Sequence, residues 1–252
     1  MADTPDRPLS NRIALVTGAS RGIGYATALA LARAGAHVVA VARTVGGLEE
    51  LDDAIRAAGG SATLVPLDVK DAEGIDRLAA ALTERYGKLD VLVGNAGVLG
   101  VPSPLPHVEA KVWDETIAVN LTVNWRLIRT LDPLLRASDA GRVVFITSGT
   151  VPLALAYWGP YVVSKAAIEA LGRVYANETA NSAVRVNLFN PGPIRTKLRA
   201  AAMPGEDPMT LETPEQAAPH IVALCLPSFL ESGKLYDYPT RRVLAFQPPA
   251  PA

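Results

Sequence analysis

Tyr161 and Lys165 are the two side chains of this sequence whose types and spacing best suit acid–base chemistry. They stand four residues apart in a segment predicted to be helical, so both lie on one face, one turn apart. A phenol has a pKa of about 10, and moving it toward 7 requires about 4 kcal/mol at 1.36 kcal/mol per unit. A nearby ammonium group shifts the pKa of a phenol in this direction. Such a pair also occurs by coincidence on helix surfaces, so its meaning depends on the rest of the chain.

The segment 17–24, Thr-Gly-Ala-Ser-Arg-Gly-Ile-Gly, is a second chemical signal. It follows an apolar strand and opens an Ala-rich helix, the context in which a glycine pattern predicts a dinucleotide site. Gly18 permits the tight turn, Gly22 lets the backbone approach a pyrophosphate, and Gly24 allows close helix–strand packing. The helix N-terminus offers N–H groups and its positive dipole end to the phosphates. The alternative is a strand-to-helix turn without a ligand. The residues expected to contact the cofactor here are Gly18, Ser20, Arg21, Gly22, Ile23 and Gly24.

The end of the second predicted strand lacks the carboxylate that dinucleotide folds commonly place there for the adenosine ribose hydroxyls. Residues 41–44 read Val-Ala-Arg-Thr, and no carboxylate follows before Glu49. Arg43 can bind a 2′-phosphate bidentately, and Arg21 can reach the same phosphate. The sequence therefore predicts NADP(H) as the preferred cofactor, with NAD(H) as the less favoured one; two solvated surface arginines are the alternative. The positive ring of an oxidised nicotinamide would add to the ammonium of Lys165 in lowering the phenol pKa.

These residues are positioned by short β-branched runs that alternate with longer Ala- and Leu-rich amphipathic segments, the pattern of βα units around a parallel sheet. The predicted strands are 13–17, 37–42, 62–67, 91–94, 142–147 and 184–189. The predicted helices are 22–34, 47–58, 71–86, 109–136, 159–179 and 214–226. Because the strands are apolar at consecutive positions, helices should cover both faces of the sheet. We expect an α/β protein with a three-layer, doubly wound Rossmann fold and a mostly parallel sheet of six to seven strands, which binds ligands at the carboxyl ends of its strands.

Three Pro- or Gly-punctuated connections, 99–106, 149–160 and 191–213, follow predicted strand ends and should form the walls of a substrate cleft. Residues 193–213, above all 197–213, have the composition of a substrate lid that orders when ligand binds. Trp158, Leu153 and Leu155 either line an apolar substrate pocket or form a helix-packing surface.

Composition bounds the classes of protein that this 252-residue chain can be. Apolar residues make up 49% and charged residues 19%, so we expect one well-packed domain over 1–252, with loose ends at 1–11 and 247–252. The net charge of −1 gives no footprint for nucleic acid or an anionic membrane. The polar N-terminal residues lack the apolar segment of a signal peptide, which predicts a cytoplasmic protein. Cys225, expected in the core, is the single cysteine, and the three histidines are far apart, so no metal site is expected.

Seven motifs occur together between Arg12 and about Thr196. In chain order they are the turn 17–24, Asp68-Val69, Gly94-Asn95-Ala96-Gly97, Asn120 within 119–121, Ser148, Tyr161-Val-Val-Ser-Lys165, and 191–196, Pro-Gly-Pro-Ile-Arg-Thr. Their combination resembles the short-chain dehydrogenase/reductase family, in its compact type of about 250 residues, close to the length of this chain. The resemblance implies an oxidoreductase that transfers a hydride between a nicotinamide and a small-molecule carbonyl compound or secondary alcohol.

The resemblance also implies a role for each catalytic residue. Tyr161 would transfer a proton to or from the substrate oxygen, and Ser148 would form a hydrogen bond to that oxygen, where fixed donors stabilise developing charge. Lys165 would hold the nicotinamide ribose hydroxyls as well as acting on the phenol. Asn120 would bind a water linked to Lys165 and so close a proton path to solvent. The alternatives are that Asn120 bends or packs a helix and that Ser148 caps a strand-end turn.

Further cofactor contacts come from the same resemblance. Asp68 and Val69 would contact the adenine. The turn formed by Asn95, Ala96 and Gly97 would lie against the adenosine ribose and support the sheet. The residues that would flank the nicotinamide, with the last on its carboxamide, are Pro191, Gly192, Ile194 and Thr196.

Two parts of the chain depart from the family pattern. Gly94 stands where the family usually has Asn, a change that should leave Asn95 working. Many relatives end with a last strand and a Gly-Gly turn that helps form the subunit interface. Here 234–239 is the only candidate strand, and Pro239 should make it short or place it at an edge. The family implies a homodimer or homotetramer in which helices 109–136 and 159–179 pair between subunits, and the atypical C-terminus leaves that choice open.

Two other functions compete with an NADPH-dependent carbonyl reductase, or its reverse, an alcohol dehydrogenase. A catalytically silent dinucleotide sensor or interaction module could use the same scaffold, but it predicts a broken catalytic set, whereas all four residues are present. An epimerase or dehydratase that holds NAD tightly would need a C-terminal substrate domain. Only 26 residues follow Leu226, too few for one.

Overall fold

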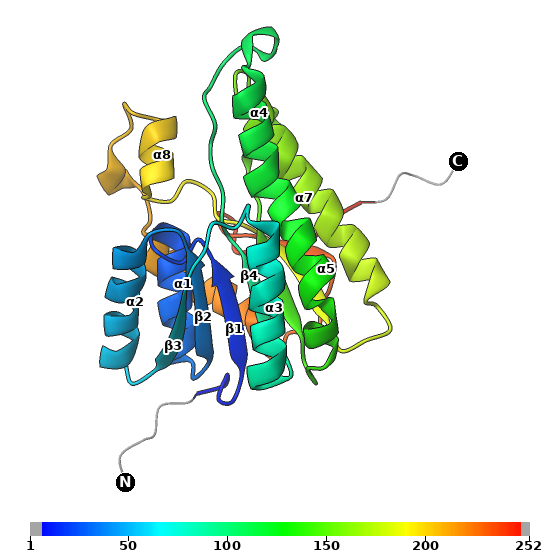
Figure 1. The fold of residues 1–252 in the computed structure, drawn as a ribbon. Coiled ribbons are helices and arrows are strands. Elements are labelled where there is room, and N and C mark those ends of the chain that lie inside the picture. Colours follow the sequence, from blue (N-terminus) through cyan, green and yellow to red (C-terminus); the bar gives the residue numbers. More distant parts are fainter. Residues whose placement is uncertain (1–6, 248–252) are drawn as a thin grey trace.

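The protein folds around one mostly parallel sheet with helices on both faces (Figure 1). The computed structural model describes residues 7–247. Within them the sheet has eight strands in the order β3-β2-β1-β4-β5-β6-β7-β8. The strands are β1 Ile13–Thr17, β2 His37–Ala42, β3 Ser61–Pro66, β4 Val91–Gly94, β5 Arg142–Ile146, β6 Arg185–Asn190, β7 Lys234–Asp237 and β8 Arg242–Ala245. This is the predicted α/β Rossmann architecture, which is thereby confirmed.

The consecutive apolar residues of the central strands are buried on both faces, as predicted. On one face Ala14 and Val16 pack with α1 (Gly22–Arg33), α2 (Val45–Ala57) and α9 (Pro214–Cys225). On the other face Leu15 packs with α3 (Ala72–Tyr86), α5 (Val123–Arg136) and α7 (Gly159–Glu178). Cys225 is buried at the end of α9, in the core as expected. Two helical layers therefore hold the strand ends at one rigid edge, where ligands bind in such folds.

The C-terminal end of the sheet differs from the prediction of six to seven strands. Strand β7 is short, as Pro239 suggested, but it is not an edge strand, because β8 pairs with it antiparallel on the side away from β6. Strand β8 is itself exposed along its whole length, so it lacks the alternation of buried and exposed residues that marks a strand in a sequence. Pro239 lies in the turn between the two strands, where it disturbs no ladder.

The predicted helix 109–136 is interrupted where Asn120 lies. It consists of α4 (Ala110–Ile117), a π-helical turn η2 (Ala118–Thr122) and α5. A π turn contains more residues than an α turn and is often found at functional sites. Asn120 is at the centre of this turn and is 1% exposed.

The three expected cleft loops contain short helices: η1 (Leu105–His107), α6 (Thr150–Leu153), α8 (Lys197–Ala202) and η3 (Pro208–Thr210). In Figure 1, α8 stands above the carboxyl ends of the strands, across from α4. The N-terminal end is less loose than predicted for 1–11, because Leu9 is fully buried and its N–H donates to Ala34 O at 2.9 Å. The rest of that segment, 1–6, and nearly all of the expected C-terminal tail lie outside the described residues.

Two features are absent from residues 7–247. No helix there has the length and apolarity needed to cross a membrane. In the same residues, no three His, Cys, Asp or Glu side chains gather in a way that could hold a metal ion.

Candidate active site

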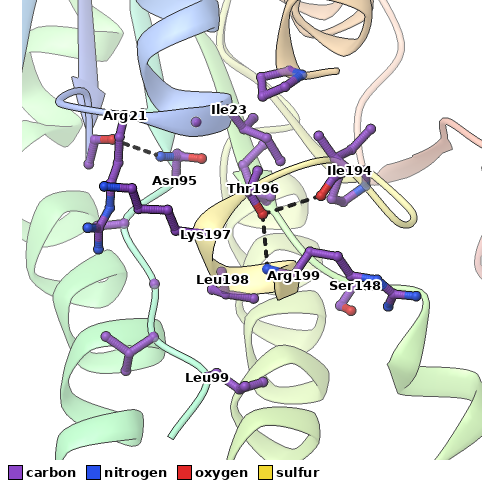
Figure 2. Close-up of a pocket in the computed structure, with 18 of the residues that line it drawn as sticks. Arg21, Ile23, Asn95, Leu99, Ser148, Ile194, Thr196, Lys197, Leu198 and Arg199 are labelled. Carbon is purple, nitrogen blue, oxygen red and sulfur yellow. Dashed lines mark hydrogen bonds between the residues drawn. The ribbon is translucent and has the colours of Figure 1, made fainter. Parts of the chain in front are cut away.

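A cavity of about 890 Å³ opens at the carboxyl ends of the strands, beneath α8 (Figure 2). It brings together eighteen of the twenty different residues that the sequence nominated; Gly24 and Asn120 are the two that do not line it. The eighteen are Gly18, Ser20, Arg21, Gly22, Ile23, Arg43, Asp68, Val69, Asn95, Ala96, Gly97, Ser148, Tyr161, Lys165, Pro191, Gly192, Ile194 and Thr196.

The glycine turn has the backbone geometry that its sequence predicts. Gly18 and Gly22 have φ values of +67° and +58°, a region that favours glycine. A Cβ on Gly24 would lie 2.3 Å from Gly18 O, so Gly24 acts in packing α1 against the turn and not on the cavity wall. Arg21, the N-cap residue of α1, provides no side-chain cap, whereas Asp71 caps α3 by accepting from Gly74 N at 3.0 Å. The first N–H groups of α1 are therefore left for an anion.

Thr17 and Asn95 join the glycine turn to the end of β4. Thr17 Oγ1 accepts hydrogen bonds from the backbone N–H groups of Asn95 at 3.0 Å and Ala96 at 3.1 Å. The Asn95 side chain donates to Thr17 O at 2.9 Å. Asn95 thus supports the sheet as predicted. The sequence analysis did not single out Thr17, because its role depends on a contact between strands far apart in the chain.

Arg21 and Arg43 are exposed at the cavity, and among residues 7–247 neither forms an ion pair. Lys70 lies near Arg43 but differs from it in forming an ion pair, with its Nζ 2.8 Å from Glu115 Oε2. Lys197 of α8, which the sequence analysis missed, extends toward Arg21 (Figure 2). This end of the cavity is therefore positively charged, because Arg21, Arg43 and Lys197 form no ion pair with a carboxylate of residues 7–247.

Tyr161 and Lys165 are both buried one turn apart on α7, with Lys165 Nζ 5.8 Å from the centre of the Tyr161 ring. Lys165 Nζ donates to Ile146 O at 2.7 Å. Burial lowers the pKa of Lys165 to about 8, because the ammonium loses solvation. Burial also raises the pKa of Tyr161, and a hydrogen bond with Ser148 opposes that rise. The protein alone therefore does not produce the lowered phenol pKa that the sequence spacing predicted.

Ser148 lies after the end of β5 and lines the cavity. Its Oγ accepts hydrogen bonds from Thr150 N at 3.3 Å and Thr150 Oγ1 at 3.0 Å. These contacts tie the hydroxyl to the first turn of α6, so its position is fixed. The sequence analysis did not single out Thr150.

Asn120 is behind the cavity wall. Its Oδ1 accepts from Val98 N at 2.8 Å, and its Nδ2 donates to Val98 O and to Ser164 Oγ, both at 2.9 Å. The side chain therefore holds the segment after β4 against α7. Its backbone oxygen accepts from Asn124 Nδ2 at 2.8 Å. The predicted water between Asn120 and Lys165 stays a prediction.

Asn124 explains the departure at Gly94. A Cβ on Gly94 would lie 2.3 Å from Asn124 Oδ1 and 2.5 Å from Phe145 Cδ1. The smaller residue therefore makes room for the amide that bonds to the π turn, and the backbone contacts of Asn95 are kept.

Trp158 lines the cavity, whereas Leu153 and Leu155 are not among its lining residues. The Trp158 and Tyr161 rings meet edge to face, with centres 6.0 Å apart and planes at 73°. Leu153 is 66% exposed, so it does not form a helix-packing surface either.

We expect the Gly24→Ala variant to lose about 1–3 kcal/mol of unfolding free energy, the usual effect of overpacking. The added methyl would lie 2.3 Å from Gly18 O and 2.4 Å from Asn95 Nδ2, and the backbone oxygen cannot move away cheaply. Urea unfolding measures the change. The matched control is Gly46→Ala in the first turn of α2, where no atom lies within 4 Å of the added methyl. That variant should be neutral or more stable, because Ala favours a helix over Gly; equal effects in both would contradict the packing argument.

Lys165 should make the stability of the cofactor-free protein depend on alkaline pH. The unfolded chain keeps this proton up to about the ordinary lysine pKa of 10.5, whereas the folded protein loses it above about 8. Between these values the unfolded state holds more protons, so the contribution of Lys165 to the unfolding free energy rises with pH. Relative to a Lys165→Met variant, the unmodified protein should gain up to about 3 kcal/mol between pH 7 and 10.5. Urea unfolding of both proteins across this range measures the gain, and a difference that does not change with pH would contradict it.

Comparison with known proteins agrees with this geometry. Residues 12–207 match the short chain dehydrogenase family. The uncharacterized oxidoreductase YciK of Escherichia coli strain K12 is 38% identical over 214 residues, which cover 84% of each chain.

Two solved structures share the fold over nearly their whole length. A short chain dehydrogenase from Shigella flexneri 2a strain 301, complexed with NADP, has a TM-score of 0.89 and 36% identity, and the match covers 93% of this chain and 99% of that one. A short chain dehydrogenase from Escherichia coli CFT073, complexed with NADPH, has a TM-score of 0.87 and 36% identity over 92% of this chain and 98% of that one. The family predicted from the motifs is thereby confirmed: the chain belongs to the short chain dehydrogenase family of oxidoreductases.

Proposed function

We propose that the protein is an NADP(H)-dependent oxidoreductase that interconverts a carbonyl compound and a secondary alcohol. The observation that carries this proposal is the convergence of Ser148, Tyr161 and Lys165 on one cavity with the glycine turn. The matched structures that hold NADP and NADPH support the choice of cofactor. When bound, the cofactor supplies the hydride to the carbonyl carbon or accepts it from the alcohol.

The residues of the cavity fit a phosphorylated dinucleotide. Gly18 and Gly22 leave the space that a Cβ would fill, and the N–H groups at the start of α1 lack a side-chain cap. Arg21 and Arg43 supply guanidinium groups for a 2′-phosphate, and neither is in an ion pair with any other described residue. Asp68 and Val69 also line the cavity, which supports the expected adenine contacts. Residues 191–196 line it as well, except Pro193, which supports the expected nicotinamide contacts.

The chain itself contributes proton transfer and charge stabilisation. In the direction of reduction, Tyr161 donates its phenolic proton to the substrate oxygen while Ser148 donates a hydrogen bond to that oxygen. In the reverse direction Tyr161 accepts the proton of the alcohol. When Lys165 is protonated, its ammonium lies close enough to the Tyr161 ring to favour the phenolate. Above pH 8 the amine loses its proton and favours the phenolate less.

The test of the proposed function is to follow NADPH absorbance with a panel of ketones, aldehydes, quinones and acyl-thioester ketones. We expect turnover with at least one class, and NADPH to be favoured over NADH. Binding of NADPH without turnover of any compound would favour a silent dinucleotide sensor instead. The expected assembly through the helices now identified as α4, α5 and α7 stays a prediction; exposed Trp125, Val163 and Val174 on α5 and α7 favour it.

The expected lid, residues 197–213, should become more resistant to proteases when NADPH and substrate bind. Residues 203–207 join α8 to η3, and six of the seven residues 203–209 are exposed. The Arg199 guanidinium binds both oxygens of Glu206, at 2.6 and 2.7 Å, and so links α8 to this segment. Limited proteolysis with mass spectrometry of the fragments measures the cleavage rate, which ligands should lower severalfold. An unchanged rate in saturating NADPH and substrate would contradict a lid that orders on binding.

A further inference from the structure

The substrate end of the cavity has apolar walls. Trp158 meets Tyr161 edge to face at 6.0 Å. Leu99, from the segment after β4, and Leu198, from α8, line the same cavity (Figure 2). Val98 adds a fourth apolar side chain. A substrate that places its oxygen on Ser148 and Tyr161 therefore meets hydrocarbon around the rest of its body.

The charged groups of the cavity are directed elsewhere. Arg199 is occupied by its ion pair with Glu206, which cancels the charge of both groups. Lys197 extends toward Arg21 at the opposite end of the cavity (Figure 2). Arg195 donates to Leu211 O at 3.2 Å, across the base of the lid. Among residues 7–247 its Nε has no hydrogen-bond partner, so it is the group that a carboxylate would use if one bound here.

The apolar walls continue onto the surface as a rim formed by Val101, Leu105 and Tyr157, which are 60%, 63% and 61% exposed. The two segments of the rim lie side by side, because Ser103 N donates to Tyr157 O at 2.8 Å. Leu105 packs so closely on Gly159 that a Cβ there would lie 2.3 Å from Leu105 Cδ2. The rim therefore adjoins Trp158, and an apolar group that leaves the cavity passes onto more apolar surface.

We propose that the substrate is an uncharged ketone or aldehyde whose apolar body extends from Ser148 and Tyr161 past Trp158 onto this rim, an inference that rests on the proposed function. Each methylene group removed from water contributes about 0.8 kcal/mol, or about fourfold in kcat/KM. A carboxylate on the same body would have to leave water for apolar walls on which the described residues offer it only Arg195 Nε, which disfavours it.

The test is a series of straight-chain 2-alkanones from 2-butanone to 2-decanone with NADPH. We expect kcat/KM to rise about two- to fourfold for each added methylene until the rim is covered. Acetophenone should be reduced at least tenfold more efficiently than 4-acetylbenzoate. Calorimetric titration of the protein with the same ketones gives a second readout, in which affinity rises with chain length. Leu105→Ser and Tyr157→Ser should weaken only the longest ketones, and Leu230→Ser, an exposed leucine between α9 and β7 that does not line the cavity, serves as the matched control.

The outcomes separate this inference from the proposed function. Ketones that bind with rising affinity but are never reduced would overturn the function and leave the apolar site standing. Reduction that does not improve with chain length, or that favours 4-acetylbenzoate, would overturn the inference and leave the function standing. Preference for the carboxylate that disappears in Arg195→Ala would assign the pocket to anionic substrates.

The hydrogen bonds around the Ser148 hydroxyl determine whether it can donate its proton to the substrate. A serine hydroxyl has one proton to donate and two lone pairs that accept. Thr150 occupies both lone pairs, through its N–H at 3.3 Å and its Oγ1 at 3.0 Å. The proton is therefore the one part of the hydroxyl left to donate, to the Tyr161 oxygen in the empty site and to the substrate oxygen when substrate is bound. Charge that builds on this oxygen during reduction needs donors, so the arrangement suits the reaction.

From this geometry we infer that Thr150 is a positioning residue that keeps Ser148 a hydrogen-bond donor. Thr150→Val removes one of the two contacts and frees the hydroxyl to turn. We expect kcat to fall about two- to tenfold, the usual effect of one neutral hydrogen bond. The alkaline limb of kcat/KM should also move to higher pH, because in the empty site a reoriented Ser148 no longer stabilises the Tyr161 phenolate. Thr150→Ser should restore both values.

Affinity for NADPH, measured by fluorescence titration, should stay unchanged in both variants. A Thr150→Val variant with unchanged kcat and pH profile would overturn the inference. Equal losses in Thr150→Val and Thr150→Ser would also overturn it, since the hydroxyl would then be irrelevant.

Discussion

Replacing Tyr161 with Phe is expected to lower kcat for carbonyl reduction by about two to four orders of magnitude, the range that general acid catalysis contributes. The substitution removes the proton that the substrate oxygen receives and keeps the ring that packs against Trp158. Because the phenol is 8% exposed, removing its hydroxyl should not open the cavity to water. Steady-state rates with NADPH and the best carbonyl compound measure the loss, and NADPH affinity should change less than threefold.

Tyr175→Phe is the matched control, since Tyr175 is also a buried tyrosine of α7 but lies away from the cavity. Its hydroxyl donates to Asp132 Oδ1 at 2.8 Å, so the control should lose stability and keep kcat. If the Tyr161→Phe variant turned over as fast as the unmodified protein, another group would have to supply the proton.

Replacing Arg43 with Ala should weaken NADPH binding roughly ten- to more than a hundredfold, because a charge-assisted hydrogen bond contributes about 1.5–3 kcal/mol. Arg43 forms no ion pair within residues 7–247, so the substitution leaves no carboxylate unpaired. NADH lacks the 2′-phosphate, and its affinity should change little. Fluorescence titration with both cofactors measures the two dissociation constants.

Arg56→Ala provides a control in the same part of the fold. Arg56 is an exposed arginine of α2 that pairs with Asp52 at 2.7 Å and does not line the cavity. Its loss should affect neither cofactor. Equal losses of NADPH and NADH affinity in Arg43→Ala would show that this side chain does not bind the 2′-phosphate.

The central strands could be predicted from the sequence almost to the residue, because β1, β2 and β4 are runs of consecutive apolar residues that end at polar residues or glycine. Strand β8 could not be predicted in this way. Its residues are all exposed, and its pairing depends on a turn in which Arg241 has a positive φ of 57°. The π turn could not be predicted from the sequence either, since Asn120 is held by Val98 and Ser164 from two other segments.

The site shows the same division between local and distant information. The glycine turn and the Tyr161–Lys165 pair are short motifs whose geometry follows from neighbours in the chain. Thr17 and Asn124 act on segments that only the folded sheet brings near. Thr150 is two residues from Ser148, yet the direction of the hydrogen bond between their hydroxyls depends on the fold of the loop and cannot be predicted from the spacing. The raised pKa of Tyr161 also follows from burial, which the spacing of two residues does not report.

The π turn Ala118–Thr122 makes the length of this helix as important as its composition. A π turn takes up one residue more than an α turn, so α4 and α5 keep the relative rotation that they would have in a continuous α-helix one residue shorter. If the turn became α-helical with this residue retained, α4 would rotate by about 100° relative to α5, the angle of one residue in an α-helix. The face of α4 that lies against α7 would then point elsewhere. The number of residues in 118–122 and the π geometry are therefore matched, and a change in one without the other would change which side of the helix closes the site.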